Sequence, residues 1–279
     1  MERVVSDLPV ETQGDFRKLA ESVYQDMGAS PKDLRPHSLH RFFTSSEYSF
    51  EAAQKKIRHH LDWRRTYDFE RAATLEKAAY QEIHRNAEIA LYGLTRDGFP
   101  IGYIRPRTDY PFGVIQSLGS DTIIDYQVQM FERLNNIIFP MCSEKSKKNI
   151  NKMVCVVDLR HSYYWGAIKD PALWKFAYRT MIQYRDNYPE MNRETILINT
   201  NWFFSTLWGA LLPYIMPKTL SKITFAKNGK HLEELLKHAD LDQIPEALGG
   251  TCKYPIEQYP NFWDPAVAKS VKEGKLSND

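Results

Sequence analysis

The spacing of apolar side chains along the first part of the chain is that of helices. After Ser49, a candidate N-cap, apolar residues recur at intervals of three and four: Phe50, Ala53, Ile57 and Leu61. This spacing places them in one stripe along a helix. The remaining positions carry lysine, arginine and histidine, and such a charged face is ordinarily solvated. Residues 1–90 are therefore predicted to be helical.

From about residue 90 the pattern changes to short apolar runs. The turn signal RDGFP precedes IGYI, which has the length of a strand. Three more runs are predicted to be strands: MVCVVDL at 153–159, TILIN at 195–199 and KITFA at 222–226. The first of these is almost continuously apolar, as in sheets that are covered on both faces.

The segments between these strands have helical periodicity. One predicted helix carries Ile124, Val128, Phe131 and Ile138 and is expected to end at Pro140. The polar stretch 143–152 indicates an exposed loop. A second helix begins near Pro171 and has four residues on one face: Trp174, Ala177, Tyr178 and Met181. Helices of ten or more residues between strands imply crossover connections and a largely parallel sheet.

The predicted fold is thus α/β, with a helical region packed on a mostly parallel sheet. We divide the chain into a helical N-terminal region at 1–90, an α/β domain at 91–255 and a polar C-terminal tail at 256–279. No internal repeat or low-complexity tract interrupts this order.

A stretch of 23 residues between Glu194 and Lys218 has no formal charge. A membrane-spanning helix needs about 20 apolar residues, but Asn199, Thr200 and Asn201 break this stretch, and Pro213 and Pro217 limit what remains. The pattern therefore favours a strand, a polar turn and a helix from Trp202 to Leu212. That helix is apolar around most of its circumference, so it is either a core helix or one that faces an apolar ligand or a membrane surface.

Composition narrows the classes of function. Over 279 residues, 37 Lys and Arg against 35 Asp and Glu leave a net charge of +2, which disfavours nucleic acid as a partner. The three cysteines are widely spaced, which argues against a disulfide scaffold or a structural zinc site and fits a reducing cytosol. The charged N-terminal segment lacks the features of a signal or transit peptide.

The succession of motifs resembles the CRAL-TRIO, or Sec14-like, family of lipid-binding and lipid-transfer proteins. The similarity covers roughly residues 35–253. It lies in RFFTSSEYSFEAAQKKIRHHLDWRR, YGLTRDGFPIGYI and VCVVDLR, and above all in the order YPE, ILIN, WFFSTLW, P-x-x-x-P, K-T-x-S-K and IPEALGG.

The resemblance implies an apolar pocket floored by the sheet, with a mobile gating helix across its mouth. The gate would lie within 202–216 and would meet the membrane through seven residues: Trp202, Phe203, Phe204, Leu207, Trp208, Leu211 and Leu212. The central strand would supply the pocket wall through Met153, Cys155 and Val157. The cargo would be a phospholipid, and phosphatidylinositol is the one expected, with no cofactor and no metal ion.

Members that bind phosphatidylinositol share headgroup residues that correspond to Glu190, Thr219 and Lys222. Thr219 and Lys222 are three positions apart and share a face in a helical turn. Two departures from the family pattern concern other contacts. Met153 and Cys155 replace the small hydroxyl residues of members that also bind phosphatidylcholine, and Ser46 and Glu47 replace an expected basic pair.

Three alternatives remain open. An enzyme is disfavoured because the common nucleotide and hydrolase motifs are absent, and because Cys155 and Asp158 would point to opposite faces of a strand. A sensor or scaffold that presents lipid to a partner, with a lipid kinase as a candidate partner, is not separated from a carrier by these residues. A different apolar cargo, such as a sterol or an isoprenoid, is the third. The leading hypothesis is a cytoplasmic protein, peripheral at membranes, that exchanges phosphatidylinositol.

Overall fold

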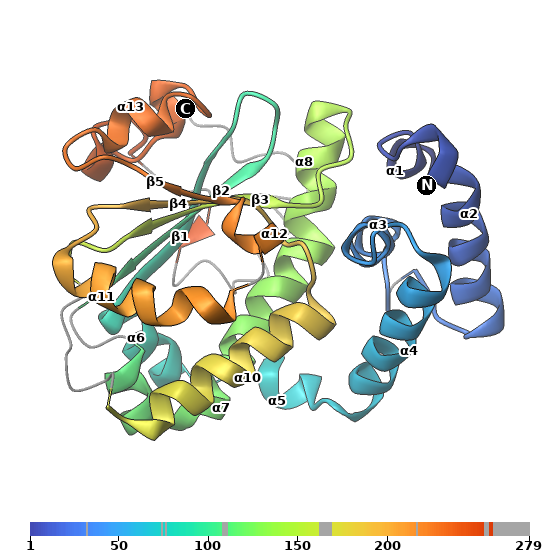
Figure 1. Ribbon diagram of the computed structural model, residues 1–279, viewed down its shortest axis with the longest axis horizontal. Helices are drawn as coiled ribbons and strands as arrows, with labels where there is room; N and C mark the ends of the chain where they lie inside the picture. The colour runs from blue at the N-terminus through green and yellow to red at the C-terminus, as the bar shows by residue number, and fades with distance from the viewer. Residues whose placement is uncertain are drawn as a thin grey trace.

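The N-terminal helices pack around an apolar core of their own. The computed structural model of the chain describes residues 1–31, 33–73, 75, 77–107, 111–161, 169–215, 217–253 and 257–258. The N-terminal elements are α1 (Glu2–Val5), η1 (Val10–Thr12), α2 (Gln13–Glu21), η2 (Ser22–Asp26), α3 (Pro36–Ser45) and α4 (Phe50–Thr66). Their core includes Phe16, Leu39 and Phe43. Figure 1 shows these helices as a separate group beside the sheet.

The predicted stripe on α4 is confirmed. The Ser49 side chain accepts a hydrogen bond from the Ala52 N–H and begins the helix. Ala53 and Ile57 are fully buried in the N-terminal core and Leu61 nearly so. The adjacent histidines diverge as the helical geometry requires, because the His60 side chain is buried whereas His59 is mostly exposed.

The helical region ends earlier than residue 90. After α5 (Phe69–Ala73) and α6 (Lys77–Asn86), strand β1 (Ala87–Leu94) pairs antiparallel with β2 (Pro100–Pro106). Sequence periodicity missed β1 because most of its residues are buried on both faces, so the strand lacks the alternation of apolar and polar residues that marks a half-exposed strand.

One sheet of six strands organises the rest of the chain. Its order is β5-β4-β3-β2-β1-β6, with β3 (Met153–Asp158), β4 (Asn192–Ile198), β5 (Ile223–Phe225) and β6 (Glu257–Gln258). Strands β2 to β5 pair in parallel, as predicted, whereas β1 pairs antiparallel with both its neighbours. Glu257 and Gln258, predicted to lie in the tail, thus add a short edge strand.

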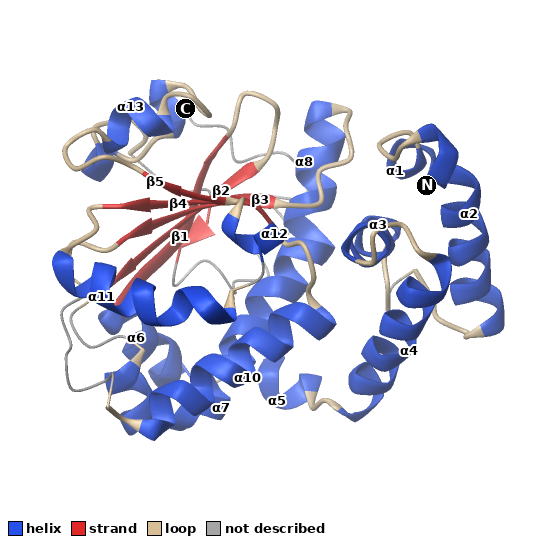
Figure 2. Cartoon of the chain, viewed as in Figure 1, coloured by secondary structure: helices blue, strands red, loops and turns tan. Residues whose placement is uncertain are grey.

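Different helices cover the two faces of the sheet (Figures 1 and 2). One face carries Tyr103, Val156 and Ile196 and packs against α13 (His231–Leu235) and the segment after it, which contains η5 (Leu241–Gln243) and η6 (Glu246–Leu248). The opposite face carries Met153 and Cys155. It packs against α6, α7 (Phe112–Arg133), α8 (Phe139–Ser146) and α10 (Pro171–Asn187).

Two expectations for the connection into β3 are wrong. Pro140 does not end a helix, because α7 continues through the π-helical turn η3 (Leu134–Ile138) into α8, whose second residue is Pro140. The segment 143–152 is not simply an exposed loop. Helix α8 extends to Ser146, and Asn149, Ile150 and Asn151 are buried.

Candidate functional site

A cluster of charged side chains lies where the parallel strands begin. The Lys222 ammonium donates a hydrogen bond to Glu190 Oε2 at 2.5 Å. Lys218 Nζ lies 3.3 Å from the other carboxylate oxygen, and Lys152 Nζ lies 3.6 Å from Oε2. The Glu190 side chain is only 11% exposed. One largely buried carboxylate is therefore shared by three ammonium groups.

The electrostatics of Glu190 follow from this geometry. Burial by itself raises the pKa of its carboxyl group. The hydrogen bond and charge of Lys222, with the charges of Lys152 and Lys218, outweigh burial and hold that pKa below its usual value. Glu190 also has a left-handed backbone, with φ of 57°, in the turn between α10 and β4. A strained non-glycine residue at such a turn is typical of functional sites.

Parallel strand register brings the cluster together. The Met153 N–H donates to the Met191 carbonyl, so Lys152 and Glu190, each just ahead of a strand, are neighbours. In the same way, the Lys222 carbonyl accepts from the Thr195 N–H at the start of the β4–β5 pairing.

The structure brings together two of the three predicted headgroup residues, Glu190 and Lys222. Thr219 lies on α12 (Pro217–Leu220), where its side chain is exposed and its carbonyl accepts from the Lys222 N–H. Sequence reasoning missed Lys152 and Lys218. The signal for Lys218 was its spacing of four from Lys222, and the signal for Lys152 was its place before the central strand.

Two lysines bind the carboxyl end of α3, next to the position of the missing basic pair. Lys218 Nζ donates to the Thr44 carbonyl at 3.1 Å, and Lys56 Nζ donates to the Ser45 carbonyl at 2.9 Å. The carbonyls at a helix C-terminus carry partial negative charge, which favours these cations. Positive charge therefore stands beside Ser46 and Glu47, supplied by other elements.

The predicted gate is helix α11 (Trp202–Leu211), continued by η4 (Leu212–Tyr214). The Asn201 side chain begins the helix by accepting from the Phe204 N–H. Phe204 and Trp208 stack on one another, and both contact Phe225 of β5, with ring centroids 6.4 and 5.2 Å away.

The described residues of α11 lie at the surface of the molecule and not in a core. None of the three apolar core clusters of the described chain includes an α11 residue, while Trp202 is 63% exposed and Leu212 is 40% exposed. The side chains of Phe203, Leu207 and Leu211 lie outside the described part. In the described chain, every helix is too short or too polar to span a bilayer.

An apolar row of the sheet lies on the side that α11 contacts. Ile104, Val157, Leu197 and Phe225 are paired successively across β2, β3, β4 and β5. Ile104 and Val157 are only half-buried, and Phe225 is 44% exposed. This row, at the carboxyl ends of the strands, is therefore incompletely covered.

The other two predicted wall residues lie deeper in the same face. Met153 and Cys155 are buried in the core beneath α7 and α10. Burial raises the pKa of the Cys155 thiol to about 12, so the thiol stays protonated and unreactive. As predicted, Asp158 points to the opposite face, where the Tyr103 hydroxyl donates to it. The two groups do not form a catalytic pair.

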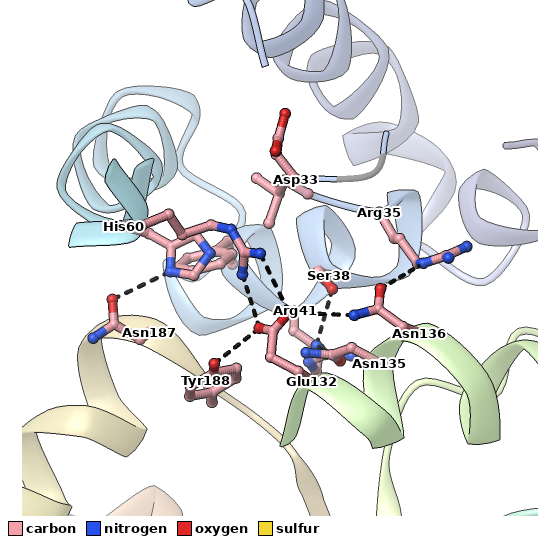
Figure 3. Close-up of a pocket in the computed structure, with 13 residues that line it drawn as sticks. Asp33, Arg35, Ser38, Arg41, His60, Glu132, Asn135, Asn136, Asn187 and Tyr188 are labelled. Atoms are coloured by element: carbon pink, nitrogen blue, oxygen red, sulfur yellow. Dashed lines mark hydrogen bonds and ion pairs between the residues drawn. The ribbon is translucent and has the colours of Figure 1, made fainter. Parts of the chain in front are cut away.

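Two clefts lie elsewhere. A polar cleft separates α3 and α4 from α7 and α10 (Figure 3). At its base, Glu132 accepts from Arg64 and from the Tyr188 hydroxyl, and the buried Arg41 guanidinium donates to Asn135. An apolar cleft lies on the α13 face of the sheet. Neither lies beneath α11, so the deep pocket under the gate stays a prediction. No described His, Cys, Asp and Glu side chains are grouped to hold a metal ion.

Comparison with known proteins gives consistent results. A family model described as CRAL/TRIO domain matches residues 86–250. The chain is 27% identical over 222 residues to the phosphatidylinositol/phosphatidylcholine transfer protein SFH9 of Arabidopsis thaliana, covering 78% of this chain and 37% of that protein. It is 23% identical over 245 residues to Patellin-6 of the same plant, covering 85% and 56%.

The comparison of structures concerns the fold alone. The crystal structure of Sfh5 superimposes with a TM-score of 0.65 at 12% identity, covering 97% of this chain and 99% of that one. In contrast, the chain spans well under half the length of SFH9 and of the related transfer protein SFH12, at 37% and 39%.

Proposed function

The chain belongs to the CRAL/TRIO domain family and is Sec14-like, and from this premise we propose that it binds a phospholipid, specifically phosphatidylinositol, and exchanges it between membranes. The observation that carries the proposal is the Glu190–lysine cluster at the amino ends of the parallel strands, together with an aromatic helix that contacts the sheet at their carboxyl ends. The named relatives SFH9 and SFH12 are phosphatidylinositol/phosphatidylcholine transfer proteins.

In this proposal, two physical requirements of a lipid carrier are assigned to different parts of the molecule. Acyl chains gain roughly 25 cal/mol per Å² when they leave water for an apolar environment, and the row of Ile104, Val157, Leu197 and Phe225 offers such a floor. A buried phosphate costs several kcal/mol unless it is paired, and the lysines supply that pairing. In the proposal, Glu190 accepts hydrogen bonds from inositol hydroxyls.

In this proposal the protein works by exchange, without chemistry on the lipid. Opening of α11 lets one lipid leave and another enter, and its exposed aromatic surface faces the bilayer during the exchange. Cys142 and Cys155 are buried free thiols, in keeping with the cytoplasmic location that the sequence favours. We propose a peripheral association with membranes there.

Replacing Lys222 by alanine is expected to reduce phosphatidylinositol loading roughly tenfold, because a charge-assisted hydrogen bond is worth about 1.5 kcal/mol or more. The measurement is mass spectrometry of lipid exchanged into purified protein from vesicles. Lys227→Ala, an exposed lysine beyond the end of β5, is the matched control. Equal loading of the Lys222→Ala variant and the unmodified protein would exclude this headgroup assignment and favour a cargo without an inositol headgroup.

Phosphatidylcholine is expected to load at least about tenfold less than phosphatidylinositol from vesicles that contain both in equal amounts. Met153 and Cys155 stand where choline-lipid binders have hydroxyl groups, and neither a thioether nor a thiol is a good donor to a phosphodiester. The same mass spectrometric assay measures the ratio. If both lipids load equally, the phosphodiester has donors other than these two positions, and the proposed selectivity is wrong.

A further inference from the structure

The polar cleft between α3, α4, α7 and α10 is lined by a buried cation whose hydrogen-bond partners are neutral (Figure 3). Arg41 is only 2% exposed. Its Nη atoms donate to the Asn151 carbonyl, to the Ser38 hydroxyl and to the side-chain oxygen of Asn135. Its Nε–H is buried and has no hydrogen-bond partner among the described residues. A buried charge that has only neutral partners costs free energy, so an anion beside Arg41 would be stabilising.

The carboxylates that act on Arg41 are already paired with other cations. Glu132 accepts hydrogen bonds from Nη1 and Nη2 of Arg64, at 2.8 and 3.2 Å, and Glu190 pairs with Lys222. Both carboxylates act on Arg41 through space. Burial lowers the pKa of the three histidines near Arg41, which are therefore neutral at pH 7: His37, His40 and His60.

The charged groups that line the cleft add up to one positive charge. At the base, Arg64 and Glu132 cancel, which leaves Arg41. At the rim, Arg35 and Asp33 carry opposite charges, and Figure 3 shows the Asp33 side chain pointing away from the other labelled groups. Outside the cleft, the described groups around Glu190 supply no net negative charge, because the lysines there outnumber the carboxylates: Lys56, Lys152, Lys218 and Lys222 against Glu190, Asp7 and Asp186.

The cleft has room for an occupant about the size of one water molecule. Its volume is about 10 Å³, which is close to the least that a bound water needs. A water molecule accepts a hydrogen bond from the Arg41 Nε–H but leaves the positive charge unpaired. A halide ion accepts the same hydrogen bond and also supplies a negative charge. Phosphate and sulfate, with four oxygen atoms around the central atom, exceed this volume.

We propose that the cleft binds one small monovalent anion of the chloride type beside Arg41, and that this anion holds the N-terminal helices against the sheet domain. Arg41 comes from α3 and Arg64 from α4, whereas Glu132 comes from α7 and Asn187 from the end of α10. Because the anion binds only where these elements meet, it stabilises the folded chain and not the unfolded one. The inference concerns neither the lipid nor the Glu190 cluster, so it goes beyond the proposed function and does not depend on it.

The test measures the melting temperature at pH 7 in sodium chloride and in sodium gluconate of equal ionic strength, because gluconate is too large for the cleft. Chloride is expected to stabilise the unmodified protein more than gluconate does, and the rise with concentration gives an apparent dissociation constant. Glu132→Gln removes the negative charge at the base and is expected to lower that constant about tenfold. Arg64→Gln removes a positive charge and is expected to abolish the difference between the two salts. Arg58→Gln, at an exposed position of α4, is the matched control and is expected to keep the difference in full.

Equal melting temperatures in the two salts at every concentration would overturn the inference, because chloride would then act through ionic strength alone. Crystals grown in sodium bromide locate the ion directly. An anomalous-scattering peak beside Arg41 supports the inference, and bromide found only elsewhere on the molecule contradicts it. If Arg64→Gln does not fold, Glu132→Gln decides, since an apparent dissociation constant equal to that of the unmodified protein would place the anion outside this cleft.

Discussion

Replacing Phe204 and Trp208 together by alanine is expected to slow lipid exchange between vesicles about a hundredfold. The two rings stack on each other and contact Phe225, so they help to hold α11 on the sheet and, in the proposed exchange, they contact the bilayer when α11 opens. Removing them forfeits about 3 kcal/mol of apolar transfer free energy at the membrane interface. Since each 1.4 kcal/mol is a factor of ten, membrane capture falls by about two orders of magnitude.

The measurement is transfer of a fluorescent lipid from donor to acceptor vesicles, with the melting temperature recorded to verify folding. Tyr48→Ala is the matched control, because Tyr48 is a partly exposed aromatic residue between α3 and α4 that contacts Phe43. An exchange rate within twofold of that of the unmodified protein would remove the gating role from α11.

The parallel sheet could be predicted from the sequence because each of its inner strands is a short, almost uniformly apolar run that a helix separates from the next. The helix bounds were harder. Pro140 was expected to end a helix, yet a π-helical turn ahead of it leaves the proline in a first turn. Such a turn is set by packing against the core and leaves no periodic signal of its own.

The exposed face of α10 shows a further limit of prediction from apolar periodicity. Trp174, Tyr178 and Met181 were correctly placed on one face of a helix, but apolar periodicity does not say whether that face is covered. Here Tyr178 is 60% exposed and Met181 is 45% exposed, while Phe176, on another side of the helix, packs into the core. Coverage depends on which elements lie opposite, and that is a property of the tertiary structure.

Only part of the candidate site could be predicted from the sequence. Glu190 and Lys222 were found through resemblance to a family, not through their spacing, since 32 positions separate them in the chain. Lys152 was missed because nothing in a sequence fixes the register between β3 and β4. Once that register is known, the contact follows, because the residues just before two parallel neighbours lie side by side.

Acid is expected to unfold the protein near pH 5. Burial lowers the pKa of His40, His60 and His84 to about 4, from an ordinary value of about 6.5. Burial keeps each ring neutral, and each has one polar neighbour: Asn151 for His40, Asn187 for His60 and Tyr126 for His84. Protonation of these rings requires that they leave these places.

The sign follows from proton linkage. Between pH 6.5 and 4 the unfolded chain binds protons at these three histidines that the folded chain does not, so the free energy of unfolding falls as the pH falls. The loss at pH 5 is about 2 kcal/mol for each histidine, or about 6 kcal/mol in all, comparable to the whole stability of many domains. Glu190, whose pKa is lowered, adds a loss at lower pH still, whereas Asp7, whose pKa is raised, opposes it.

Two adjacent histidines of α4 allow this pH dependence to be tested. Urea unfolding at pH 7, 6 and 5 measures the slope, and His60→Gln is expected to reduce the loss between pH 7 and 5 by about 2 kcal/mol. His59→Gln, on the exposed side of the same helix turn, is expected to keep the slope of the unmodified protein. A free energy of unfolding that stays constant from pH 7 to 5 would contradict the assignment. His60 of α4 is buried beside Asn187 at the end of α10. Its protonation therefore destabilises the contact between the N-terminal helices and the sheet domain, and acid is expected to separate these two parts before either core unfolds.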